Sequence, residues 1–175
     1  LVRLICSYSL IYNIEMMKYA KTLKVHDPLG EIGNLHRPNQ TAHLMGVDIR
    51  LDSLGNRSPE LEVPRKSNDR VIYLGGASAT MGWGVPQEKI VSAIVGDLLN
   101  VKKPLGEDLH FSVVNAGHGN FNMIDSVNLL MRQASVIRPD MVALLYYISS
   151  IEPKPIGQHS RLLDDSYLAN YLEYG

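Results

Sequence analysis

The chain lacks several sequence features, and each absence excludes a class of structure or of partner. It holds a single cysteine, Cys6, so an internal disulfide is excluded. Neither sign of charge is in excess, because 17 basic residues stand against 18 acidic ones, which gives no basis for a nucleic-acid partner. Internal repeats and low-complexity tracts are also missing. What is left is the composition of an ordinary globular domain.

Long hydrophobic runs are missing too. The first dozen residues, Leu1–Tyr12, are apolar, but Arg3 interrupts them and a membrane-spanning helix needs about 20 residues. Two interpretations stay open for them: the end of a signal or membrane segment, or an amphipathic helix packed on the domain. Because the chain starts at Leu1 and a helical pattern runs into Gly175, we expect a piece of a longer protein. Localisation, membrane association and oligomeric state stay open.

The spacing of apolar residues divides the chain near residue 65. We expect residues 1–65 to form an N-terminal helix and lead-in segment, and residues 66–175 to form an α/β domain that is incomplete at its C-terminus. The patterns in the first part are a helix over about 7–24, a loop at 25–42 and a strand over 44–51. In the second part the expected elements alternate: strand 71–74, helix 87–99, strand 110–116, helix 123–137 and strand 141–148.

Three strands separated by two helices of crossover length predict βαβ units and a buried parallel sheet. The fold class is therefore α/β, a three-layer α/β/α sandwich. The strand at 141–148 is apolar throughout, which predicts a central position for it. Ligands of such sheets bind at the carboxyl ends of the strands. Polar or glycine-rich segments follow all three strands, at 76–84, 117–122 and 149–153.

Ser78 lies where the first of these strands gives way to small residues. A strand, tight turn and helix in succession can expose one hydroxyl beside unpaired backbone N–H groups, which stabilise developing negative charge. A nucleophilic serine also needs a base to accept its proton. The turn could instead hold a nucleotide phosphate. However, the chain lacks Gly-x-Gly-x-x-Gly in the right phase, a following Lys-Ser/Thr pair and an acidic residue at the end of the second strand.

These segments resemble the SGNH (GDSL-like) serine hydrolases. Gly76–Val85 resembles the first block of the family, Val113–Asn122 the second, and Pro139–Ser150 the strand that leads to the third. Residues 43–47 and 52–60 resemble the lead-in segment of some bacterial members. The resemblance implies a flavodoxin-like sandwich and an esterase or O-acyltransferase. Its substrate would be a small-molecule or carbohydrate acyl ester, and it would need no cofactor and no metal.

The resemblance also implies a role for individual residues. Ser78 matches the nucleophile, and its own backbone N–H would form the oxyanion hole together with that of Asn120, at the second-block glycine position. Ser149 stands where the family has an asparagine side chain, so that amide donor is lost, at a typical cost of about 10²–10³ in rate. We expect Trp83 to pack on the sheet or line the pocket, and His118 to be a surface or substrate-contacting residue.

The general base of the family has no match. Asp-x-x-His does not occur in the chain, and in the family this block lies near the C-terminus. Ala77 also replaces the usual aspartate, which is not the nucleophile. Three hypotheses therefore stay open. The chain is part of an ester hydrolase whose base lies beyond Gly175, a catalytically impaired SGNH-fold binding or interaction module, or a nucleotide-binding α/β domain.

Overall fold

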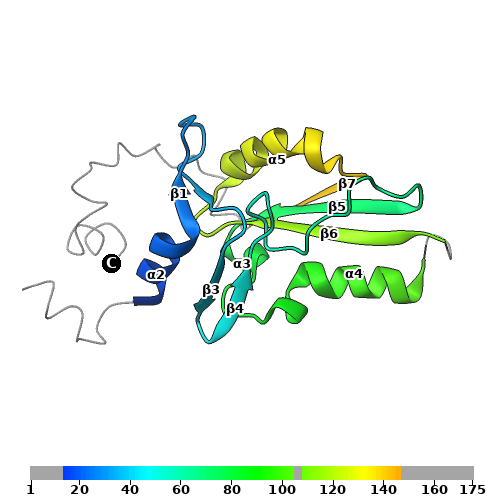
Figure 1. Ribbon diagram of the computed structural model, residues 1–175, viewed down its shortest axis with the longest axis horizontal. Coiled ribbons are helices and arrows are strands. Elements are labelled where there is room, and N and C mark those ends of the chain that lie inside the picture. The colour runs from blue at the N-terminus through cyan, green and yellow to red at the C-terminus, as the bar shows by residue number, and fades with distance from the viewer. Residues whose placement is uncertain (1–13, 105–107, 147–175) are drawn as a thin grey trace, which may run out of the picture.

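A parallel sheet lies at the centre of the structure, a computed structural model that describes residues 14–104 and 108–146 (Figure 1). Its order is β6-β5-β7. The bounds of these strands are β5 (Asp69–Gly76), β6 (His110–Gly117) and β7 (Met141–Leu145). The prediction of an α/β chain with a parallel sheet is confirmed.

The register of the sheet aligns the carboxyl ends of its strands. Gly76, the last residue of β5, lies opposite Gly117 of β6 and Leu145 of β7. The segments that follow the three strands therefore start from one edge of the sheet. This carboxyl edge is where ligands bind in parallel sheets.

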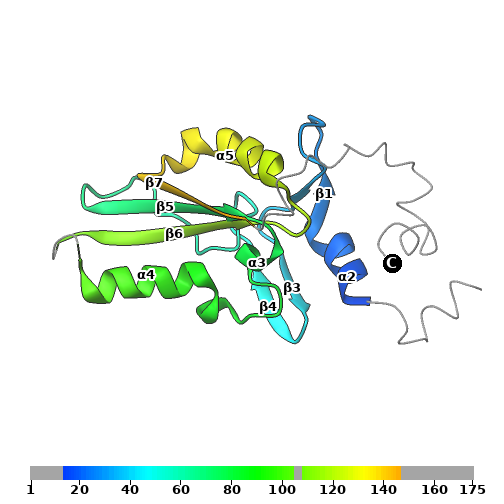
Figure 2. The same ribbon diagram turned by 180° about the vertical axis from the view of Figure 1, so that it is seen from behind.

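Helices lie on both faces of the sheet. α4 (Val91–Lys102) packs on β6, and α5 (Met123–Ile137) packs on β5. Figures 1 and 2 show the two helices on opposite sides of the strands. The connection from β5 to β6 crosses the sheet in one direction, and the connection from β6 to β7 passes β5 and crosses it in the opposite direction. Because both crossovers have the same hand, their helices lie on opposite faces of the sheet.

α5 has the bounds that the sequence predicted. It begins at a capping box, in which the Asn122 side chain accepts a hydrogen bond from the Asp125 N–H (2.8 Å) and the Asp125 carboxylate accepts one from the Asn122 N–H (3.2 Å). It ends where Arg138 takes a left-handed conformation with φ 48°. The capping box also holds the end of the segment that connects β6 to α5.

The main apolar core lies between the sheet and α5. It comprises Ile32, Val71, Tyr73, Val114, Ala116, Phe121, Leu129 and Ile137. The 27–32 loop is held over α5 by an ion pair, because Arg132 donates two hydrogen bonds of 2.7 Å to the buried Asp27 carboxylate. These bonds hold the pKa of Asp27 well below its usual range.

The N-terminal part packs at the carboxyl edge of the sheet. Its elements are α2 (Ile14–Leu23), β1 (Lys24–His26), β2 (Asn34–His36), β3 (Thr41–Leu44) and β4 (Val47–Arg50). Two antiparallel pairs, β1–β2 and β3–β4, join these strands. A second apolar cluster joins this part to the short helix α3 (Ser78–Met81) and includes Tyr19, Leu23, Leu44, Ile49, Leu51 and Met81. The lead-in segment is therefore part of the surroundings of Ser78.

Three expected elements differ in the structure. The continuous strand expected at 44–51 is a hairpin, because Met45 (φ 52°) and Gly46 (φ 74°) turn the chain between β3 and β4. The loop expected at 25–42 contains β2 and parts of β1 and β3. The helix expected from residue 87 starts as a 3-10 turn, η1 (Gln87–Lys89), and only then becomes α4.

Among the described residues β5 is the central strand and β7 lies at one side of the sheet, so the central position expected for strand 141–148 is not observed in this part. Within residues 14–104 and 108–146, β7 pairs with β5 alone, and its Met141, Val142, Leu144 and Leu145 are all partly exposed. The expected elements at 7–13, 147–148 and 166–175 lie outside the described residues. Within the described part, no helix has the length and apolar character needed to cross a membrane.

Candidate active site

Ser78 is exposed at the carboxyl edge of the sheet, directly after the central strand. It begins the single helical turn α3, two residues beyond the end of β5. Among residues 14–104 and 108–146, nothing hydrogen-bonds to its Oγ or to its backbone N–H. The hydroxyl and one donor are thus available at the position that the sequence predicted.

Close approach of β6 fixes the position of α3. A Cβ atom on Gly117 would lie 2.3 Å from the Met81 backbone nitrogen, so only glycine allows β6 to come this near. The Asn115 side chain joins the same two elements. It donates to the Thr80 carbonyl (2.8 Å) and accepts from the Gly117 N–H (3.0 Å). Close packing and a side-chain hydrogen bond therefore join the serine turn to the end of β6.

A fully buried arginine, Arg57, holds the other end of α3. Its guanidinium donates to the carbonyl oxygens of Asp48, Met81, Gly82 and Val85 and to the side-chain oxygen of Gln87. Burial lowers the pKa of Arg57, and the Glu88 carboxylate opposes this shift. The charge is met by carbonyl dipoles at the C-terminus of α3 and in the turn that follows it.

Asn120 lies in the segment that follows β6, at the same sheet edge as Ser78. It is exposed and has φ 67°, the left-handed conformation that asparagine tolerates better than most residues. In the part of the chain that the structure describes, its N–H has no hydrogen-bond partner. Asn120 thus has a left-handed backbone conformation of the kind that glycine adopts readily. Its role as a donor stays a prediction.

The peptide before Asn120 is held from the N-terminal part of the chain. The Gly119 N–H donates to the Tyr19 hydroxyl (3.0 Å), and the Gly119 carbonyl accepts a hydrogen bond from Lys24 Nζ (3.1 Å). Burial raises the pKa of Tyr19, so its hydroxyl stays neutral. Sequence patterns gave no sign of either residue, because both contacts join positions about a hundred residues apart.

His118 lies in the core and not at the surface. It is 2% exposed and is stacked between His36 (ring centroids 3.7 Å apart) and Phe121 (4.3 Å). Its Nδ1 bonds to the Ala116 carbonyl (3.2 Å), and its Nε2 accepts from the His36 backbone N–H (3.3 Å). Burial lowers the pKa of His118 to about 3. The expectation of a surface histidine is therefore corrected, because both ring nitrogens are already bonded inside the protein.

Trp83 and Ser149 complete the set of predicted site residues. Trp83 is partly buried and packs edge-to-face on Tyr19, with ring centroids 5.1 Å apart. Trp83 thus packs on α2, while the expected packing on the sheet and the role in lining a pocket stay predictions. Ser149 lies outside the described residues.

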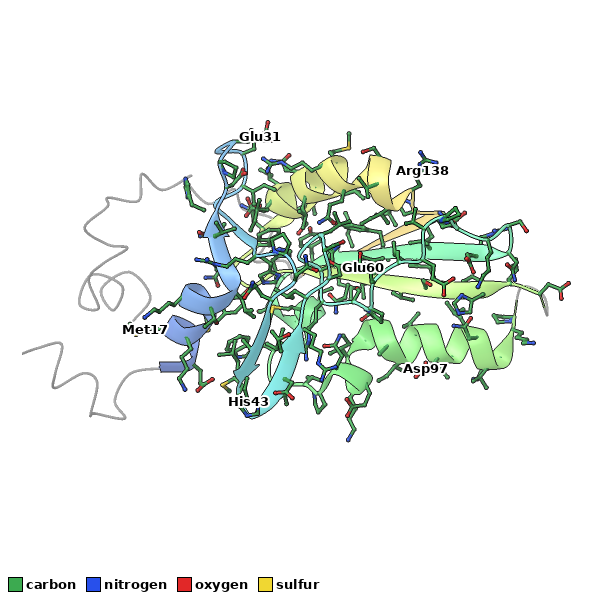
Figure 3. All side chains as sticks on the ribbon, in the orientation of Figure 1. Met17, Glu31, His43, Glu60, Asp97 and Arg138 are labelled. Atoms are coloured by element: carbon green, nitrogen blue, oxygen red, sulfur yellow. The ribbon has the colours of Figure 1, made fainter. Side chains whose placement is uncertain are left out.

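In the part of the chain that the structure describes, two histidines pair with carboxylates, but neither pair includes a contact with Ser78. His110 Nδ1 lies 3.3 Å from Asp69 Oδ1, at the amino ends of β6 and β5 and so at the opposite end of the sheet. Figure 3 shows His43 on the β3–β4 hairpin. Its Nδ1 lies 2.7 Å from Oδ1 of Asp48, its cross-strand partner. No histidine in the described ranges hydrogen-bonds to Ser78, so these ranges assign no general base.

Searches against known proteins add no identification. No protein-family model matches the chain, and no curated protein matches it. Within residues 14–104 and 108–146, no group of three or more His, Cys, Asp or Glu side chains is placed to hold a metal ion. The interpretation of the site therefore depends on its geometry.

Proposed function

We propose that this chain belongs to a serine hydrolase of the SGNH type that acts on ester bonds through Ser78. The substrates would be O-acyl or O-acetyl groups, including those on carbohydrate, and water or an alcohol would accept the acyl group. One observation carries the proposal. Ser78 is exposed directly after the central strand, and both its own N–H and that of Asn120 lack partners among the described residues.

The strand order supports the proposed fold. In β6-β5-β7 the first strand in sequence lies in the middle, the second on one side and the third on the other. A flavodoxin-like sheet begins in the same way, and it binds ligands between its first and third strands, where the direction of the connections reverses. With helices on both faces (Figures 1 and 2), this order favours a three-layer sandwich with its site next to Ser78.

The proposed reaction follows from this geometry. The Ser78 hydroxyl attacks the ester carbonyl carbon while a base takes its proton, and the carbonyl oxygen becomes an oxyanion. The Ser78 and Asn120 N–H groups donate to that oxyanion. The C–O bond to the alcohol then breaks, the alcohol leaves with the proton from the base, and an acyl-serine remains. Water or a second alcohol releases the acyl group by the reverse sequence of steps.

A covalent probe tests the nucleophile. The full-length protein is used, because the described residues assign no base to activate Ser78. Treated with a fluorophosphonate, it is expected to gain one phosphonyl group on Ser78, detected by mass spectrometry of its peptides. Ser78→Ala is expected to reduce labelling to background, because the attacking oxygen is gone. Ser135→Ala, which changes an exposed serine on α5, serves as the matched control and is expected to label like the wild type.

A catalytically impaired binding module of the same fold is the second candidate. It is favoured by the absence, within residues 14–104 and 108–146, of a histidine bonded to Ser78. An unlabelled full-length wild-type protein that binds an O-acetylated sugar saturably would replace the hydrolase proposal with this one. The nucleotide alternative has less support, because the single turn of α3 aligns few peptide dipoles. Stabilisation by ATP or NAD would restore it.

A further inference from the structure

We propose that Lys24 is a positioning residue that directs the Asn120 N–H toward the oxyanion. The inference rests on the proposed function, since it explains how one donor of that site is oriented. It concerns a lysine at the junction of α2 and β1, a part of the chain that contributes no reacting group.

The peptide between Gly119 and Asn120 carries the argument. Lys24 Nζ donates a 3.1 Å hydrogen bond to the Gly119 carbonyl oxygen. A trans peptide is planar, and its C=O and N–H point in opposite directions. The bond that draws the Gly119 oxygen toward Lys24 therefore directs the Asn120 N–H away from Lys24. That N–H is the one left without a partner among the described residues.

Tyr19 holds the preceding peptide in the same place. Its hydroxyl accepts the Gly119 N–H at 3.0 Å, and a Cβ atom on Gly119 would lie only 2.8–2.9 Å from the Tyr19 ring and hydroxyl. Lys24 Nζ also lies 5.0 Å from the centre of the Tyr19 ring, a cation–π distance. The two side chains thus fix successive peptides of the segment, and Asn120 follows in its left-handed conformation.

The charge of Lys24 adds to its geometric effect. Hydrogen bonds from an ammonium group are stronger than those between neutral groups. A cation on the carbonyl oxygen draws electron density through the conjugated amide, which makes the N–H on its far side a better donor. Lys24 would therefore both orient and strengthen the donor without contacting the substrate.

The test compares Lys24→Met, Lys24→Arg and Lys21→Met in the full-length protein. Methionine keeps the apolar stem of the lysine but removes the ammonium, while arginine keeps the charge and the donors. Lys21 is an exposed lysine in the last turn of α2, so its replacement is the matched control. Two quantities are measured: the rate constant for fluorophosphonate labelling of Ser78, and the amide resonance of Asn120 in ¹H–¹⁵N spectra.

We expect Lys24→Met to shift the Asn120 amide resonance and to slow labelling about 10- to 100-fold, somewhat less than the loss of a whole oxyanion donor. Lys24→Arg should restore both quantities most of the way, and Lys21→Met should change neither. An unchanged Asn120 resonance in Lys24→Met would overturn the positioning role. If the wild type is labelled and Lys24→Met is labelled at the same rate, the positioning role is also overturned. If the wild type does not label, the proposed function fails, and the resonance alone still decides whether Lys24 orients this peptide.

Discussion

Replacing Arg57 with methionine is expected to lower the free energy of unfolding by about 3–5 kcal/mol, a large loss for a single substitution. The substitution removes the donors that meet five acceptors around α3, among them the Met81, Gly82 and Val85 carbonyls. Each buried acceptor left without a donor costs about 1–3 kcal/mol, although some will recover a water or another partner.

The same substitution should affect the site. Arg57 holds the carbonyls at the C-terminus of the turn that begins with Ser78, so without it the position of the serine is no longer fixed from that side. We therefore expect slower labelling of Ser78 in Arg57→Met even in conditions where the variant is folded. Arg57→Lys keeps the charge but has fewer donors and lacks the planar guanidinium. Its free energy of unfolding and its labelling rate should lie between those of the wild type and Arg57→Met.

Urea unfolding at neutral pH measures the stability change. Arg50→Met is the matched control, because Arg50 is exposed on the neighbouring strand β4, and its replacement should cost no more than about 0.5 kcal/mol. Equal costs at positions 50 and 57 would show that the buried contacts of Arg57 do not stabilise the fold.

Lowering the pH from 7 to 5 is expected to destabilise the protein by up to about 4 kcal/mol, about 2 kcal/mol for each of two buried histidines. His36 and His118 are stacked in the core, and burial is the main cause that lowers the pKa of both. The nearby charge of Lys24 lowers both further. The bonds of the two rings fit neutral imidazoles, because His118 Nε2 accepts from the His36 N–H and His36 Nε2 faces the Tyr19 hydroxyl.

The sign follows from proton uptake. Below about pH 6.5 the unfolded chain protonates these histidines, while the folded chain does so only near the lowered pKa, about 3 for His118. Unfolding therefore takes up protons in this window. The free energy of unfolding therefore keeps its full value above pH 6.5 and decreases as the pH falls below it. Asp27 has a lowered pKa and destabilises only in more acidic solution. Asp52 has a raised pKa, so its effect on stability has the opposite sign.

Urea unfolding at several pH values between 8 and 5 tests this prediction. His118→Gln should remove about half of the pH dependence, because one titrating group is lost. His26→Gln, which changes an exposed histidine on β1, should leave the dependence unchanged. A wild-type stability that stays constant from pH 7 to 5 would contradict the prediction, as would equal pH dependence in the His118 and His26 variants.

Elements with strong local patterns were predicted well. The helix at 123–137 has the predicted bounds, and the strand at 110–116 is extended by one residue in β6. Asn122 and Asp125 mark the helix start within four residues of sequence, and the apolar period of α5 continues to Ile137. In these elements the residues that decide the conformation are neighbours along the chain.

Elements that depend on distant partners were missed. The strands β1 and β2 have three residues each, and they exist because Lys24–His26 pairs with Asn34–His36. The β3–β4 turn uses Met45 and Gly46, which lack the Asn-Gly signal of a tight hairpin. The composition of β7 predicts a central strand, but among the described residues β5 has that place, because strand order depends on how the crossovers run.

The site divides in the same way. The sequence by itself determined that Ser78 follows a buried strand and that a residue tolerant of left-handed geometry, Asn120, follows the next, because both depend on local turn chemistry. Only the tertiary structure decided that His118 is buried and that Lys24 and Arg57 hold the two segments. The identity of a lysine, arginine or histidine does not tell whether its side chain is exposed or buried. Burial is decided by the packing of segments that are distant in the sequence, which excludes water from the side chain and supplies its hydrogen-bond partners.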